Sequence, residues 1–158
     1  MRLRFNGRAA ANSQVLMPHM PRPLLLYDGV CGLCNRFVQF IVRHDRNAVF
    51  RFASLQSSLA ARLLARHGAN PTDLDTVYVV LNHDLTDEYL LARSDAVRFV
   101  LNQLGGPWLL AAIPLQLFPK FLRDPAYNAV ARHRYLIFGR SDTCTLPRDQ
   151  DQTRFLDG

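Results

Sequence analysis

Two cysteines separated by two residues are the part of this sequence best suited to chemistry. Cys31 and Cys34 follow closely on the apolar run Leu24–Tyr27 and open a stretch with helical periodicity. A Cys-x-x-Cys pair placed where a strand gives way to a helix is the layout of a dithiol redox centre. The spacing therefore predicts thiol–disulfide exchange.

The two cysteines are expected to take different roles. Cys31 falls in the first turn of the predicted helix, where unpaired backbone N–H groups carry about half a positive charge. Such a setting lowers a cysteine pKa from about 8.5 to roughly 3.5–7.5, which favours the thiolate. We therefore predict Cys31 as the attacking nucleophile, with at least partial exposure. Cys34, one turn further along the same face, is predicted to lie deeper and to resolve the mixed disulfide.

Asp28 stands three residues before Cys31, and two interpretations of its role remain open. As a partly buried carboxylate it would shuttle a proton for Cys34. As a turn residue it would cap the chain beside Gly29. A carboxylate close to Cys31 would raise the pKa of that thiol, against the helix charge. An ionised Asp28 is therefore expected to face Cys34 or a cation.

The same cysteines allow a non-enzymatic alternative. Zinc usually takes four ligands, and Cys31, Cys34 and Cys144 with a histidine would form a Cys₃His set, although the spacing fits no familiar pattern. Cys144 is equally open to being an idle thiol or a second redox partner. The choice is between an enzyme that needs no bound cofactor and a structural or zinc-binding module.

Composition narrows the class of protein. The chain has 158 residues and a formal charge of +6, and eighteen of its nineteen cations are arginine. These arginines form no dense block, which gives nucleic-acid binding little support. No apolar stretch reaches the roughly 18–20 residues of a membrane span, and the N-terminus lacks the apolar core of a secretory signal. Three cysteines are too few for a secreted disulfide scaffold. We expect a cytoplasmic protein without stable membrane association.

The order of predicted elements indicates an α/β fold. Residues 1–22 are interpreted as a flexible arm and residues 23–158 as a single domain. Strands are expected at 24–27, 48–53, 76–81 and 88–91, and helices at 31–44, 54–66, 94–104, 107–117 and 119–138. The first two strands form a βαβ unit and should be parallel, whereas the last two form a hairpin. This is the thioredoxin-like plan, a three-layer sandwich with a mixed four-stranded sheet, followed by a C-terminal helical extension and a polar, irregular tail.

Two further polar groups are candidates for substrate binding. Ser94 and Asp95 open the predicted helix 94–104, either as its cap, with Ser94 at the N-cap, or beside the substrate groove. Arg134 and Tyr135 lie in the last predicted helix, where they either face solvent and pack along the helix or lie over the Cys31 end.

Taken together, these residues resemble the DCC family of thiol-disulfide oxidoreductases, whose Asp-x-x-Cys-x-x-Cys signature matches Asp28, Cys31 and Cys34. The likeness covers roughly residues 23–157. It includes the blocks 27–29, 52–56, 94–97, 134–135, 138–140, 144–147 and 154–156, with Pro119, Arg123, Asp124, Tyr127 and Ala131.

The resemblance implies a thioredoxin-like fold and dithiol–disulfide exchange. Thioredoxins place a cis-proline before the third strand, packed against the redox pair; here Thr76 stands at that position and is a candidate for contact with a substrate backbone. The implied activity is that of a protein-disulfide reductase with Cys31 attacking, Cys34 resolving and Asp28 assisting proton transfer. Its partners would be a disulfide-containing protein or small-thiol substrate and a thiol electron donor.

Overall fold

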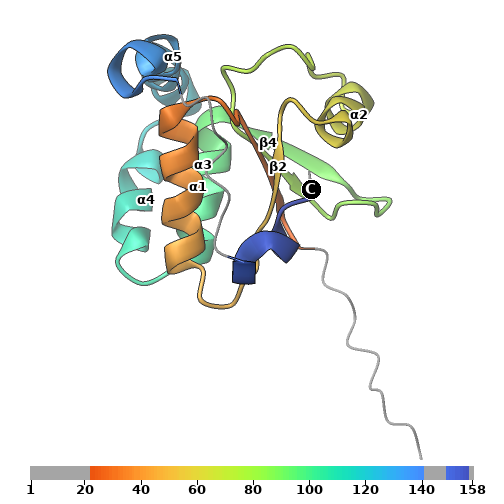
Figure 1. Cartoon of the computed structure of the whole chain (residues 1–158). Helices are drawn as coiled ribbons and strands as arrows, with labels where there is room; N and C mark the ends of the chain where they lie inside the picture. The colour runs from red at the N-terminus through yellow and green to blue at the C-terminus, as the bar shows by residue number, and fades with distance from the viewer. Residues whose placement is uncertain (1–21, 141–148, 157–158) are drawn as a thin grey trace, which may run out of the picture.

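The computed structural model describes residues 22–140 and 149–156 (Figure 1). The strands are β1 (Leu24–Tyr27), β2 (Arg51–Ser54), β3 (Tyr78–Leu81) and β4 (Tyr89–Ala92). The helices are α1 (Gly32–His44), α2 (Ser58–Arg66), α3 (Arg93–Leu104), α4 (Trp108–Leu117) and α5 (Lys120–Phe138), and a 3₁₀ turn follows at Asp149–Arg154. Residues 1–21 of the predicted arm and Cys144 lie outside the described residues.

The four strands form one mixed sheet in the order β2-β1-β3-β4. Strand β1 runs parallel to β2, with Tyr27 opposite Ser54, and antiparallel to β3, while β3 and β4 pair as a hairpin. The crossover from β1 through α1 to β2 is the expected βαβ unit. The predicted mixed four-stranded sheet, with a parallel βαβ pair and a terminal hairpin, is therefore confirmed.

Alternation along β1 divides the core between the two faces of the sheet. Leu25 and Tyr27 point toward the face that α1 and α3 cover, and belong to the cluster that holds Ile41 of α1 and Val100 of α3. Leu24 and Leu26 point to the opposite face and pack with the apolar side of α2. Because successive side chains of a strand face opposite ways, an entirely apolar strand needs cover on both faces. The sheet therefore lies between two layers of helices, which is the predicted three-layer arrangement.

Strand β2 begins later than the predicted 48–53 because a carboxylate holds the chain before it. Asp45, just after α1, accepts hydrogen bonds from the N–H groups of Val49 and Phe50 at 3.0 and 2.9 Å. Ala48 takes a left-handed conformation with φ of 48°. These backbone groups are therefore committed to a turn, and pairing with β1 begins only at Arg51.

The two added helices lie on the side of the sheet that carries α1 and α3. Figure 1 shows α4 alongside α1 and α3, and α5 across the end of α1 at which that helix begins. Several of their apolar side chains stay exposed, Leu117 and Leu136 among them. In the described parts of the chain, no helix is long and apolar enough to cross a membrane. Helix α5 is the element that carries Arg134 and Tyr135 to the start of α1.

The described end of the tail is anchored rather than irregular, which corrects the expectation for residues 149–156. Arg154 is buried, forms an ion pair with Asp45 and donates from Nε to the carbonyl of Phe50 at 3.1 Å. Phe155 stacks on Phe52 with ring centroids 4.9 Å apart. A buried ion pair with further hydrogen bonds and a stacked aromatic pair fix this segment beside β2.

Candidate active site

The dithiol lies where β1 ends and α1 begins. Cys31 is the N-cap of α1 and its N–H donates to the carbonyl of Asp28 at 3.2 Å. Its Sγ in turn accepts a hydrogen bond from the N–H of Cys34 at 3.4 Å. A sulfur that caps a helix N-terminus sits at the positive end of the helix dipole. The structure therefore places the Cys31 sulfur at the end of α1 that attracts negative charge.

Cys34 lies one turn into α1, and both cysteines are free thiols in this structure. Burial raises the pKa of Cys34 to about 12, and the nearby charge of Cys31 and a side-chain hydrogen bond with it act in the same direction. A second negative charge beside an existing thiolate is disfavoured in a low-dielectric site. Cys34 therefore keeps its proton near neutral pH.

The exposure of the two sulfurs is the reverse of the prediction. Cys31 is 0% exposed, whereas Cys34 is only partly buried. The cover comes from the segment after α5: Gly32 N–H donates to the carbonyl of Gly139 at 3.3 Å, and Cys31 pairs with Arg140 in an isolated antiparallel bridge. These contacts join residues more than a hundred positions apart, so local sequence gave no sign of them.

Gly32 is the residue that lets this covering segment lie so close. A Cβ built on Gly32 would overlap the carbonyl oxygen of Phe138 and lie 3.2 Å from that of Gly139. Backbone on both sides leaves the extra atom no room. Only glycine fits between the first turn of α1 and the end of α5.

We expect Gly32→Ala to uncover Cys31. Displacing the covering segment removes about one or two backbone hydrogen bonds, so alkylation of Cys31 by iodoacetamide should accelerate by roughly tenfold. Peptide mass spectrometry separates the labels on the two cysteines. Arg140→Ala is the control, because it keeps the main-chain bridge and should leave the rate near that of the wild type. An unchanged rate in Gly32→Ala would show that residues 138–140 do not limit access.

Asp28 is fully buried at the centre of a hydrogen-bond network. Its Oδ1 accepts from the N–H of Val30 at 3.1 Å and from Nε2 of Gln56 at 2.8 Å. Its Oδ2 accepts from Nη2 of Arg134 at 3.0 Å and from the hydroxyl of Tyr135. Of the two expected orientations, toward Cys34 or toward a cation, the structure shows the carboxylate paired with a cation. Four donors stabilise a buried carboxylate in its ionised form.

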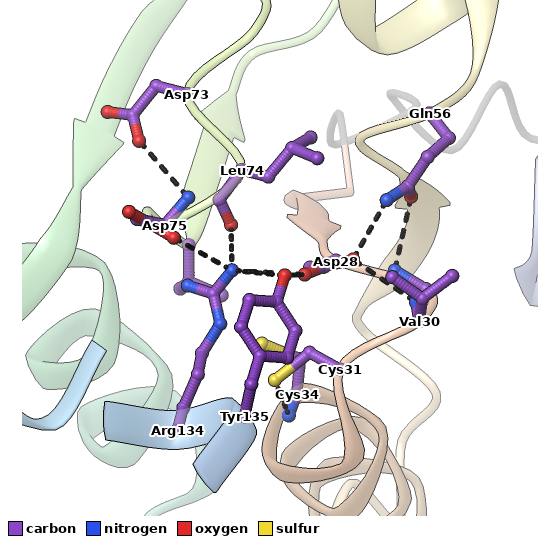
Figure 2. Close-up of polar contacts among 12 residues, drawn as sticks. Asp28, Val30, Cys31, Cys34, Gln56, Asp73, Leu74, Asp75, Arg134 and Tyr135 are labelled. Atoms are coloured by element: carbon purple, nitrogen blue, oxygen red, sulfur yellow. Dashed lines mark hydrogen bonds and ion pairs between the residues drawn. The ribbon is translucent and has the colours of Figure 1, made fainter. Parts of the chain in front are cut away.

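Arg134 joins this carboxylate to the loop before β3. Its Nη2 also donates to the carbonyl of Leu74 at 2.8 Å and to the Tyr135 hydroxyl at 2.7 Å, and pairs with Asp75 at 3.1 Å. Figure 2 shows Arg134 and Tyr135 reaching from α5 toward Asp28, beside Cys31 and Cys34. Of the two interpretations left open by the sequence, the structure supports a place over the Cys31 end.

The guanidinium also acts on the sulfurs. Burial alone would lower the pKa of Arg134, but its hydrogen bond with Tyr135 and the attraction of Cys34 and Cys31 raise it. In return, the charge of Arg134 lowers the pKa of Cys34, against the larger effect of burial. Arg134 thus neutralises Asp28 and stabilises negative charge on the dithiol.

Gln56 is a member of this site that sequence reasoning missed. Its side chain donates to Asp28 and accepts from the N–H of Gly29 at 3.2 Å, so one amide holds the turn before Cys31. The signal was present in the βαβ prediction. Parallel strands end at the same edge of a sheet, and Gln56 follows β2 as Asp28 follows β1.

The other predicted substrate-binding residues are engaged within the protein. Thr76 is buried and its hydroxyl donates to Asp73 at 3.0 Å. Ser94 is not the predicted N-cap: α3 is capped by Ala92, without a side-chain bond, and Ser94 donates to Asp124 of α5. A buried hydroxyl takes the partner that tertiary packing provides.

Asp95 likewise fastens α3 to α5. It pairs with Arg123 and Lys120, each at 3.0 Å. Burial raises the pKa of Asp95, but hydrogen bonds from Lys120 and Arg123 outweigh it and hold the pKa below the usual value. Neither Ser94 nor Asp95 is free of protein partners, although Ser94 also borders a pocket.

That pocket lies between α1, α3, α4 and α5 and has a volume of about 700 Å³. Its lining is almost entirely apolar and includes Leu33, Phe37 and Val97. Cys34, and not Cys31, faces this space. The dithiol can therefore be approached through the pocket at Cys34, or at Cys31 after the covering segment moves.

The described residues add no ligand to the zinc site that Cys31 and Cys34 could form. Among the described residues, the only group of three that could hold a metal is His83, Asp84 and Glu88 in the β3–β4 hairpin, which excludes both cysteines. Cys144, the proposed third ligand, lies outside the described residues.

Comparisons with known proteins agree with this site. The model of the family described as DCC1-like thiol-disulfide oxidoreductase matches residues 25–140. A DCC family protein of Arabidopsis thaliana, described as chloroplastic, is 42% identical over 125 residues, covering 79% of this chain and 70% of that protein. The protein YuxK of Bacillus subtilis (strain 168) is 38% identical over 137 residues, covering 87% of this chain and 96% of its own length. No solved structure gives a significant match.

Proposed function

Because the chain belongs to the DCC1-like thiol-disulfide oxidoreductase family, we propose that Cys31 and Cys34 are its exchanging dithiol and that it acts as a protein-disulfide reductase. The observation that carries this proposal is the N-cap position of Cys31, whose Sγ accepts the N–H of Cys34. A helix N-terminus and a nearby guanidinium favour the thiolate that exchange requires.

The exchange proceeds in two steps. The Cys31 thiolate attacks one sulfur of a substrate disulfide, that S–S bond breaks, and the other substrate sulfur leaves and takes a proton. Cys34 then loses its proton and attacks the Cys31 sulfur of the mixed disulfide. The substrate leaves as a dithiol, and the enzyme keeps the two-electron oxidation as a Cys31–Cys34 disulfide.

The surrounding residues position this chemistry. Asp28 holds Arg134 beside the sulfurs, and Gln56 and Tyr135 fix the orientation of Asp28. The predicted proton transfer from Cys34 to Asp28 stays a prediction. The structure shows the Asp28 carboxylate accepting four hydrogen bonds, and none of them comes from Cys34. The first step also needs access to Cys31, so residues 138–140 must move aside when a protein disulfide binds. The two backbone contacts that must break are worth about 0.5–1.5 kcal/mol each, so the free-energy cost of this movement is small.

A redox titration tests the proposal. The protein is equilibrated over a range of reduced-to-oxidised dithiothreitol, quenched with an alkylating agent and read by mass spectrometry, in a Cys144→Ser background. We expect Cys31 and Cys34 to lose their labels together as one two-electron couple. A midpoint close to the cytosolic poise of roughly −220 to −320 mV fits a reductase in a reducing compartment, whereas a midpoint near −120 mV would indicate an oxidant. Independent labelling of the two cysteines at every potential would refute a dithiol centre.

A further inference from the structure

The pocket beside Cys34 has the properties of a small-molecule site. Its volume of about 700 Å³ lies within the roughly 300–1,000 Å³ of ligand pockets in proteins. Apolar side chains from four helices form most of its lining, Leu115 and Leu122 among them, and Cys34 contributes a sulfur. A molecule that enters here therefore meets a chemically competent atom.

The pocket also contains a charge with unused hydrogen-bonding capacity. The side chain of Arg123 borders the pocket and is only 9% exposed. Its Nη2 donates to Asp95 at 3.0 Å, but Nε and Nη1 have no hydrogen-bond partner among the described residues. Buried guanidinium N–H groups are nearly always satisfied, so two unsatisfied donors on a side chain that borders a pocket indicate an acceptor that comes from outside the protein.

The charges around Arg123 favour an anion as that acceptor. Arg123, Lys120 and Arg98 share the single carboxylate of Asp95, at 3.0, 3.0 and 3.9 Å. The next carboxylate, that of Asp124, accepts from the Ser94 hydroxyl. Three cations against two carboxylates leave a positive excess beside an apolar cavity. A carboxylate complements this excess, and a guanidinium N–H donates a charge-assisted hydrogen bond to it.

Resting on the proposed dithiol exchange, we propose that this pocket binds the small electron donor of the enzyme. The donor is an amphipathic acid that carries a dithiol on an apolar chain ending in a carboxylate. The chain lies against the apolar lining, the carboxylate accepts a hydrogen bond from Nη1 of Arg123, and the sulfur end meets Cys34.

The step balances with this donor alone. A donor thiolate attacks Sγ of Cys34 in the oxidised enzyme, the Cys31–Cys34 bond breaks, and Cys31 leaves as a thiolate at the N-terminus of α1. The second donor thiol gives up its proton and attacks its own neighbouring sulfur, which releases Cys34. The donor becomes a cyclic disulfide and two electrons pass to the enzyme; the proton of the second donor thiol goes to Cys34, while Cys31 stays a thiolate.

Dihydrolipoate is the probe that matches this description, and its test uses the full-length oxidised protein. We expect its reduction of the Cys31–Cys34 disulfide to saturate with concentration, and octanoate, which has the chain and the carboxylate but no sulfur, to inhibit competitively. Reduction by dithiothreitol, which lacks chain and carboxylate, should not saturate. Dihydrolipoamide, with a neutral head, should bind roughly tenfold to a hundredfold more weakly.

Variants separate the pocket from the dithiol. Arg123→Gln should raise the dihydrolipoate concentration at half-maximal reduction by roughly tenfold to a hundredfold. The same substitution should leave the half-maximal concentration of dihydrolipoamide unchanged. Arg132→Gln is the matched control: it removes another arginine of α5, but its exposed side chain does not border the pocket and lies outside the cations that contact Asp95. Ala126→Trp, on the pocket wall, should block both probes if Arg123→Gln proves unstable.

The outcomes are distinguishable. If dithiothreitol itself does not cycle the disulfide, the proposed function fails. If it does, while dihydrolipoate reduces without saturation or octanoate has no effect, the pocket proposal alone fails. Inhibition by octanol equal to that by octanoate would refute the role of Arg123, and inhibition only by apolar peptides would assign the pocket to a protein segment instead.

Discussion

Arg134→Met is expected to destabilise the folded protein by about 3–5 kcal/mol, because it leaves the buried Asp28 carboxylate without its counter-charge. In the structure the Arg134 side chain is 3% exposed and that of Asp28 is 0% exposed, so water cannot replace the lost guanidinium. The link to the Leu74 carbonyl is lost as well. Thermal unfolding followed by circular dichroism should show a fall in Tm of roughly 10 °C.

Two comparisons make this result specific. Arg132→Met changes the same residue type on an exposed position of α5 and should alter Tm little. The double variant Asp28→Asn/Arg134→Met removes both charges and should be more stable than the sum of the single variants predicts. Additive effects in the double variant would mean that the ion pair is incidental.

The parts of the site that the sequence predicted are those set by local pattern. The apolar strand, the glycine after Asp28 and the helical spacing of Phe37 and Ile41 lie within twenty residues, and strand, turn and helix formed as expected. The order of later elements was enough to predict the parallel βαβ pair and the hairpin, because such connections leave few arrangements. The start of α2 is similarly local: Ser54 and Ser57 were both suited to cap it, and Ser57 is the N-cap, with its Oγ accepting from the N–H of Ala60.

The parts that failed depend on distant chain segments. The burial of Cys31 comes from residues 139–140, and the turn before β2 from Asp45 and its partner Arg154. Ser94 follows the helix rule for a cap but bonds to Asp124, thirty residues on. A propensity states what a residue does without neighbours, and in each case a neighbour from far along the chain decided the outcome.

The reversed exposure raises the question of which sulfur attacks. Burial and the neighbouring Cys31 raise the pKa of Cys34 to about 12, so Cys34 stays a thiol near neutral pH. Uncovering Cys31 requires the loss of about two backbone hydrogen bonds, or roughly 1–3 kcal/mol. We therefore expect Cys31, the N-cap of α1, to be the attacking sulfur.

Cys31→Ser is therefore expected to lower reduction of a model protein disulfide by roughly a thousandfold or more, because it removes the nucleophile. Cys34→Ser should also stop turnover but keep the first step, so that a mixed disulfide accumulates on Cys31. Mass spectrometry of the intact protein and of its peptides identifies the trapped bond. Cys144→Ser serves as the control and should retain wild-type rates. A mixed disulfide that accumulates on Cys34 in Cys31→Ser instead would assign the attack to the exposed sulfur, and activity retained in both variants would remove the dithiol from the reaction altogether.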